Sequence, residues 1–198
     1  MTVTQQPAPE LVGQRAAEIF ALIQADEDFP RLETSTKRYP DCWASFTGYP
    51  IICEWNEPVD KHPLFTEGLR LLALKSAVFE LTNGDENAAE LLASAPVDEM
   101  VHAILAQFTL VVRIQDRLKI NFVHMTDTER WGYEAGDYTH QCYRVAFGEV
   151  PPERFWIGKQ ETARRLSILR GLYDSIGIED TGRSHEIDFE KVDAPTAA

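Results

Sequence analysis

Residues 64–81 read LFTEGLRLLALKSAVFEL, and this stretch decides the fold class. At about 100° per residue its apolar side chains fall on two sides of a helix rather than on one face. One side carries Phe65, Leu69, Leu72 and Phe79, and the other carries Leu74, Val78 and Leu81. A helix that is apolar on several sides is usually buried on several sides. We therefore predict that residues 64–81 form the central helix of a bundle.

Apolar residues at helical spacing predict three further long helices. The first begins near Pro9 and is broken by Pro30 and the polar run that follows it. The second begins at Pro96 and continues to about Phe122, and the third covers about 159–176. Gly177 stands where a left-handed helix cap is expected. A short helix is also predicted over 87–94, because Asn83 and Glu86 have the spacing of a capping box.

An aromatic-rich insert separates the first helix from the central one. It runs from Tyr39 to about Pro63, and Thr47-Gly48 is compatible with a short hairpin. Residues 1–8 and 179–198 lack a helical apolar period, so we expect a flexible N-terminal tail and a flexible acidic C-terminal tail. Residues 9–178 then form one domain. The fold class expected is all-α, an irregular bundle of about four main helices that carries the insert.

The charge balance limits the kinds of partner. The 198 residues include 32 acidic and 19 basic ones, for a formal net charge of −13. This charge disfavours nucleic acid and anionic membranes, and it suits a basic protein partner. The three cysteines, Cys42, Cys53 and Cys142, have no paired spacing. Together with the absence of a long apolar run or a signal-like N-terminus, this favours a soluble cytoplasmic protein.

Two short motifs resemble those of carboxylate-bridged di-iron bundles. Glu99 and His102 have the E-x-x-H form, and Asp137 and His140 have the form D-x-x-H. If residues 96–122 are one helix, Glu99 and His102 lie about 140–160° from the centre of its apolar stripe. We therefore expect both side chains to be solvated and predict no metal or other cofactor, with iron or haem as the alternative.

Residues 131–143 have the most unusual composition in the chain, with four aromatic residues, a histidine and a cysteine. They are compatible with a ligand pocket, with His140 as a base or haem ligand, or with a helix end whose rings pack and whose polar tips reach water. Aromatic side chains here and in the insert are the candidate binding residues. The candidates are Trp43, Tyr49, Trp55, Trp131, Tyr138 and His140.

No catalytic residue is identified from the sequence, because it contains no phosphate-binding loop, nucleophile elbow or H-E-x-x-H motif. The function expected is that of a non-catalytic, acidic, helical interaction protein: an accessory subunit, an assembly factor or an inhibitor of a basic protein. The alternatives are a metal- or haem-dependent oxidase component and an enzyme with a pocket near residues 131–143. The sequence leaves the oligomeric state open.

Overall fold

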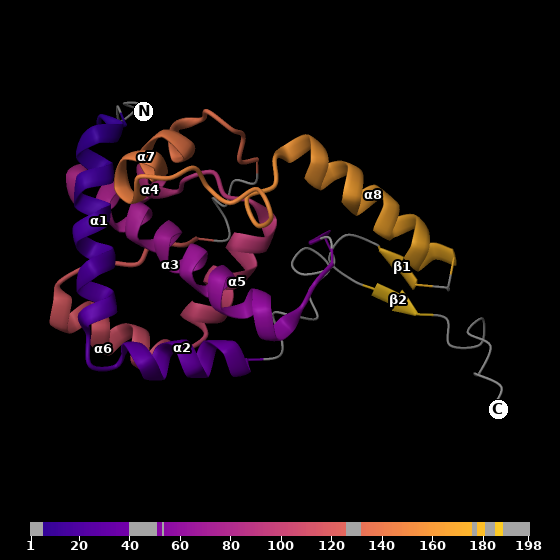
Figure 1. The fold of residues 1–198 in the computed structure, drawn as a ribbon, viewed down its shortest axis with the longest axis horizontal. Coiled ribbons are helices and arrows are strands. Elements are labelled where there is room, and N and C mark those ends of the chain that lie inside the picture. The colour runs from indigo at the N-terminus through magenta and orange to yellow at the C-terminus, as the bar shows by residue number, and fades with distance from the viewer. Residues whose placement is uncertain are drawn as a thin grey trace.

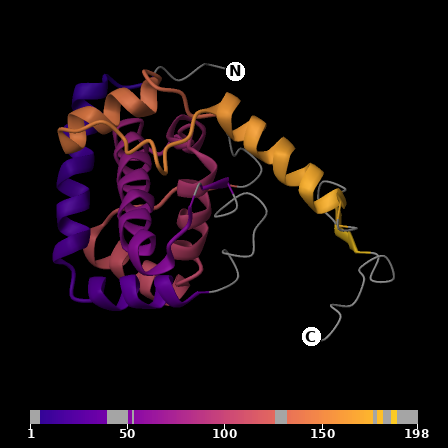
Figure 2. The ribbon, with the colours of Figure 1, turned by 45° about the vertical axis from the view of Figure 1, so that its right-hand side comes forward.

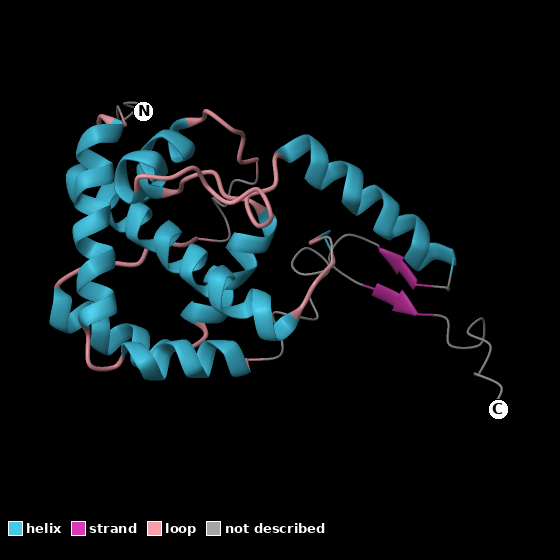
Figure 3. Cartoon of the chain, viewed as in Figure 1, coloured by secondary structure: helices cyan, strands magenta, loops and turns pink. Residues whose placement is uncertain are grey.

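The structure is a computed structural model that describes residues 6–39, 51–52, 54–125, 132–175, 178–180 and 185–187. Within these residues the chain forms eight helices and one pair of short strands, which confirms the all-α fold class (Figures 1 and 3). The helices are α1 (Pro9–Ala25), α2 (Phe29–Arg38), α3 (Glu57–Leu81), α4 (Glu86–Ala89), α5 (Ala95–Leu105), α6 (Phe108–Leu118), α7 (Tyr138–Phe147) and α8 (Lys159–Ser175).

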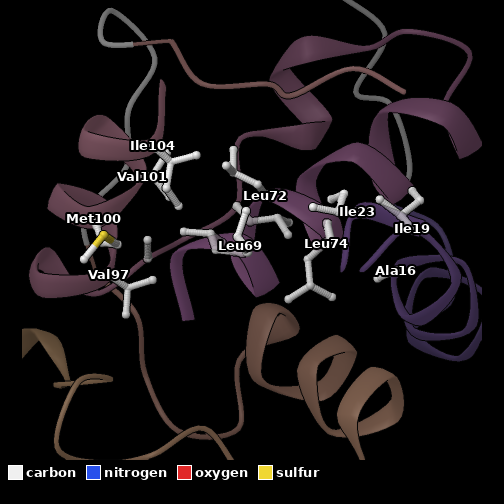
Figure 4. Packing of buried hydrophobic residues seen from close by; sticks show 14 of the residues in the cluster. Ala16, Ile19, Ile23, Leu69, Leu72, Leu74, Val97, Met100, Val101 and Ile104 are labelled. Atoms are coloured by element: carbon white, nitrogen blue, oxygen red, sulfur yellow. The ribbon is translucent and has the colours of Figure 1, made fainter. Parts of the chain in front are cut away.

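Helix α3 is the centre of the bundle, as the sequence predicts. It packs against α1 on one side and α5 on another, and Leu69, Leu72 and Leu74 are buried between them (Figure 4). The helix begins at Glu57, earlier than its apolar pattern does, and contains Pro63 in its second turn. Because α1, α2, α4, α5 and α7 all contact α3, it has apolar residues around most of its circumference.

Two glycines allow the helices to approach closely. A Cβ atom at Gly68 of α3 would lie 2.8 Å from Cγ of Met100, which belongs to α5. A Cβ atom at Gly13 of α1 would lie 2.5 Å from Cβ of Val145, which belongs to α7. Both distances are shorter than the normal separation of packed carbon atoms. Glycine at these positions therefore fixes how close α5 and α7 lie to the rest of the core.

The single long helix predicted from Pro96 to about Phe122 is wrong, because this part of the chain forms two helices. The chain bends by 87° between α5 and α6, at Ala106 and Gln107. Phe108, which the periodicity assigns to the apolar stripe, begins α6 and is 71 % exposed. Only α5 and α6 together have the length and hydropathy of a membrane span, and no single described helix has them.

Two more helices lie where the sequence predicts none. Pro30 does not end the helical region: it occupies the first turn of α2, where its missing N–H costs no hydrogen bond. Helix α7 lies in the segment 126–148, where the glycines obscure the periodicity. The short helix α4 is capped by Asp85, whose carboxylate accepts the backbone N–H of Ala88, rather than by Asn83.

Helix α8 extends away from the bundle and carries an antiparallel strand pair, β1 (Ile178–Asp180) and β2 (His185–Ile187), in both ribbon views (Figures 1 and 2). The strands fall at the end of the predicted domain and within the predicted C-terminal tail. Helix α8 packs through Leu166 and Leu169, near its middle, onto Ile51, Ala95 and Ile157. Gly177 and most of the aromatic insert lie outside the described residues.

Candidate functional site

Six ionisable side chains from four parts of the fold meet beside α3 and α5. We call them the buried polar cluster: Lys75, Glu90, Asp98, Glu99, His102 and His124. Lys75 comes from α3, and Glu90 directly follows α4. Asp98, Glu99 and His102 belong to α5, and His124 lies in the segment after α6. Charged side chains are seldom buried without partners, so such a cluster requires an explanation in chemistry or in folding.

Lys75 and Glu90 form the most deeply buried ion pair of the cluster. Nζ of Lys75 lies 2.7 Å from Oε1 of Glu90, and each side chain is 1 % exposed. The second carboxylate oxygen of Glu90 makes no hydrogen bond. Nζ of Lys75 also lies 3.3 Å from Nδ1 of His124. The pair therefore places one cation and one anion next to this histidine.

Asp98 lies between the two histidines. Its Oδ1 is 3.9 Å from Nδ1 of His124, and its Oδ2 is 3.5 Å from Nε2 of His102. The histidine rings are themselves close, with their centroids 4.7 Å apart. One nitrogen from each histidine and one oxygen of Asp98 all lie within 4.8 Å of one another. Among the described residues, these three form the group whose geometry suits a metal ion.

Glu99 contacts the opposite edge of the His102 ring. Its Oε2 lies 3.5 Å from Nδ1 of His102, whereas Asp98 lies on the Nε2 side. The side chain of His102 is 30 % exposed, while those of Asp98 and His124 are 2 % and 4 % exposed. The cluster therefore reaches the surface at His102. With both histidines neutral, the six side chains carry a formal charge of −2, from three carboxylates and one ammonium group.

The bend after α5 explains how these residues come together. Asp98 and His102 are four residues apart on α5 and so share a face. After the bend, α6 ends at Leu118 and is followed by Lys119, whose φ of 55° lies in the left-handed region and turns the chain. Residues 120–125 then return to α5, with Ile120 and Val123 buried and His124 against His102. A face of α5 that would otherwise be solvated is thereby covered.

The predicted solvation of Glu99 and His102 is therefore wrong. Glu99 is buried and His102 is only partly exposed. The face assignment assumed one straight helix over 96–122 and could not include a segment that folds back onto α5. Lys75, Glu90, Asp98 and His124 were not singled out. Lys75 stands inside the helix that is predicted to be buried on several sides, however, and a lysine in such a place indicates a buried partner.

The other metal candidates, Asp137 and His140, have structural contacts instead. Asp137 caps α7, its Oδ1 accepting the backbone N–H of His140 at 2.8 Å. Nδ1 of His140 lies 2.8 Å from the hydroxyl oxygen of Tyr133. Neither residue belongs to the metal-compatible group found among the described residues.

The predicted binding residues are only partly described. Trp43, Tyr49 and Trp131 lie outside the described residues, and Trp55 is half-buried against the core. Tyr138 donates a hydrogen bond to the carbonyl oxygen of Pro7. The expected interaction surface therefore stays a prediction.

A cleft of about 460 Å³ is lined in part by residues of the segment 131–143. Tyr133, Glu134, His140 and Trp156 are among its lining residues. The nearby Cys142 is fully buried, and burial raises the pKa of its thiol to about 12. A thiol with such a pKa is a poor nucleophile near neutral pH, so Cys142 is a core residue.

Comparisons with protein-family models, with curated proteins and with solved structures find no match. The functional argument therefore rests on the chemistry of the buried polar cluster.

Proposed function

We propose that this chain binds a divalent transition-metal ion through Asp98, His102 and His124. The observation that carries the proposal is the approach of one ligand atom from each side chain to within 4.8 Å of the other two. Bonds of about 2.0–2.2 Å to a common ion place ligand atoms about 3–4 Å apart. The three side chains thus reach such an ion after a small inward movement.

The ligand set favours a particular class of metal. Two imidazoles and one carboxylate suit zinc, iron(II), cobalt(II) and nickel(II), whereas magnesium and calcium prefer oxygen ligands. Three protein ligands leave at least one coordination position for water or another ligand, and the partly exposed His102 lies where the cluster reaches the surface.

Glu99 fits the role of an outer partner. Histidines that bind metals commonly donate their second ring N–H to a carboxylate, which fixes the tautomer and the orientation of the ring. Glu99 lies beside Nδ1 of His102 while Asp98 lies beside Nε2. Glu99 is therefore placed to accept the Nδ1 proton when Nε2 binds the ion.

Charge balance supports a divalent ion, and it also defines the competing explanation. A dication would cancel the formal charge of −2 that the six side chains carry when both histidines are neutral. Two protonated histidines would cancel it equally well, since an uncompensated buried charge is costly. In that case the cluster would be a network of ion pairs with no metal.

Metal content and metal titration distinguish these explanations. The full chain, purified without chelators, should contain close to one transition-metal ion. After metal removal, cobalt(II) should restore a visible ligand-field spectrum. At a free-metal concentration 100 times the dissociation constant, the metal should stabilise the fold by about 2.7 kcal/mol. Asp98→Asn and His124→Gln should weaken cobalt binding at least about tenfold.

His140→Gln is the matched control, because His140 lies outside the cluster. It should bind cobalt as the natural sequence does. Absence of saturable cobalt or zinc binding, or equal loss of binding in the control, would refute the metal proposal and leave the ion-pair network as the explanation.

A further inference from the structure

Lys75 contacts His124, one of the three residues proposed to bind the metal. Its ammonium group bonds to Glu90 and approaches Nδ1 of His124 at 3.3 Å, deep in the protein. Glu90 and Asp98 also face this histidine nitrogen, at 3.7 and 3.9 Å. Two carboxylates and one ammonium group therefore surround the same edge of the ring.

The hydrogen-bonding chemistry of lysine determines the state of that nitrogen. An ammonium group has three donors and no acceptor, whereas a neutral imidazole has one N–H and one lone pair. When Lys75 donates to Nδ1 of His124, Nδ1 must present its lone pair. The ring proton is then on Nε2. The structure thus assigns the Nε2–H tautomer to His124 as long as Lys75 keeps this contact.

Metal coordination is incompatible with that contact for either ring nitrogen. If the ion binds Nδ1, it takes the lone pair that accepts from Lys75. If the ion binds Nε2, the proton moves to Nδ1, and Nδ1 becomes a donor that faces another donor. In both cases the Lys75–His124 hydrogen bond is lost.

We infer that Lys75 competes with the metal ion for His124 and thereby sets the affinity of the site. This inference rests on the proposed metal-binding function. In the metal-free protein, Lys75 bridges Glu90 and His124. When metal binds, Lys75 retains Glu90 and releases the histidine. The buried ammonium group therefore holds metal affinity below what Asp98, His102 and His124 would provide without it.

Removal of the ammonium group tests the inference. Lys75→Met should lower the dissociation constant for cobalt(II) at least about tenfold, because a competing positive charge near the ligands is gone. This variant also leaves Glu90 without its buried partner, so we expect it to be destabilised. The double variant Lys75→Met/Glu90→Gln removes both charges together, which conserves net charge and avoids an unpaired carboxylate.

The double variant should also bind cobalt more tightly than the natural sequence, because the ammonium group that competes for His124 is gone while the net charge of the cluster is unchanged. Lys37→Met is the control: Lys37 pairs with Glu33 on α2, outside the cluster, and this variant should leave cobalt affinity unchanged. In the metal-free natural sequence, ¹⁵N spectra of the histidine rings should show His124 with its proton on Nε2. In the folded double variant this tautomer preference should be lost.

The outcomes separate the inference from the function on which it rests. If the natural sequence binds cobalt through His124 but the folded double variant binds equally or more weakly, the role of Lys75 is refuted and the metal site stands. If neither the natural sequence nor the Lys75 variants bind cobalt, both are refuted. A His124 proton on Nδ1 in the metal-free natural sequence would also refute the inference.

Discussion

Glu67 shows how one buried carboxylate can join several elements. Its Oε2 accepts hydrogen bonds from Nε1 of Trp156 at 2.7 Å and from the hydroxyl group of Tyr143 at 2.9 Å. Its Oε1 accepts from Arg70, which also donates to the Tyr143 hydroxyl oxygen. Burial raises the pKa of Glu67 despite these donors. Both carboxylate oxygens of Glu67 are thus bonded inside the protein, and the group is best explained as structural.

Replacing Tyr143 with phenylalanine tests that explanation. The change removes a hydroxyl group that donates to Glu67 and accepts from Arg70, while the buried ring is kept. The unfolding free energy should fall by about 1–3 kcal/mol, because polar groups are left unsatisfied inside the protein. Urea denaturation of both proteins measures this difference in unfolding free energy. Tyr138→Phe is the control: its hydroxyl group contacts the Pro7 carbonyl oxygen and the Cys142 thiol, neither of them a buried charged group, and the loss should be smaller. Equal losses would contradict the network's importance.

At the residue scale the sequence singled out two of the six residues of the buried polar cluster. The E-x-x-H spacing singled out Glu99 and His102, because helical neighbours can be read from the chain. Two other members of the cluster, Lys75 and His124, lie 27 and 22 residues from His102 in the chain, and only folding brings His124 against His102 and Lys75 against His124. A single lysine in an apolar helix indicates that a partner exists, but it does not identify that partner.

At the scale of elements, apolar periodicity predicted the uninterrupted helices and missed the bend between two helices. The positions of α3 and α8 follow from apolar spacing, since each is one helix. Apolar residues continue at helical spacing across Ala106 and Gln107, so the pattern does not reveal the bend between α5 and α6. No glycine or proline marks it. The buried polar cluster depends on this bend, which explains why the sequence misplaced Glu99.

The left-handed residue that ends α6 provides a test at this scale. Lys119 has φ of 55°, where a Cβ atom clashes with the following carbonyl group and glycine is favoured. Lys119→Gly should therefore raise the unfolding free energy by about 0.5–1 kcal/mol. Gln14→Gly, at an exposed position inside α1, should lower it by a similar amount. Urea denaturation of both variants measures the difference, and a destabilised Lys119→Gly would contradict this account of the turn.

At the scale of the whole molecule, part of the acidic excess holds elements together. Asp26, in the turn between α1 and α2, pairs with Arg117 of α6 at 2.6 Å. Asp60, near the start of α3, pairs with Arg154 in the segment before α8 at 2.7 Å. Both carboxylates are nearly buried, and hydrogen bonds from the arginines lower the pKa of each one. The charge of −13 is thus not only a property of the outer surface.

These contacts predict a defined dependence of stability on pH. A carboxylate whose pKa is lower in the folded than in the unfolded state stabilises the fold above its unfolded pKa, about 4. Its contribution is lost as pH falls from there through the folded pKa. Glu67 acts in the opposite direction, because its folded pKa is raised. Asp60 is the more informative residue to change, since it accepts from both Arg154 and the backbone N–H of Asn56.

Asp60→Asn should lower the unfolding free energy by about 1–2 kcal/mol at pH 7, the cost of weakening hydrogen bonds to a charged group. As pH falls below 4, the natural carboxylate takes up a proton, so the two proteins should converge in stability. Urea unfolding at steps between pH 7 and pH 2.5 measures the convergence.

Glu18→Gln is the control. It removes an exposed partner of Arg15 and should change the unfolding free energy by less than about 0.5 kcal/mol across this pH range. A constant difference between Asp60→Asn and the natural sequence would show that Asp60 contributes through shape, because a contribution from its charge must disappear when the carboxylate is protonated.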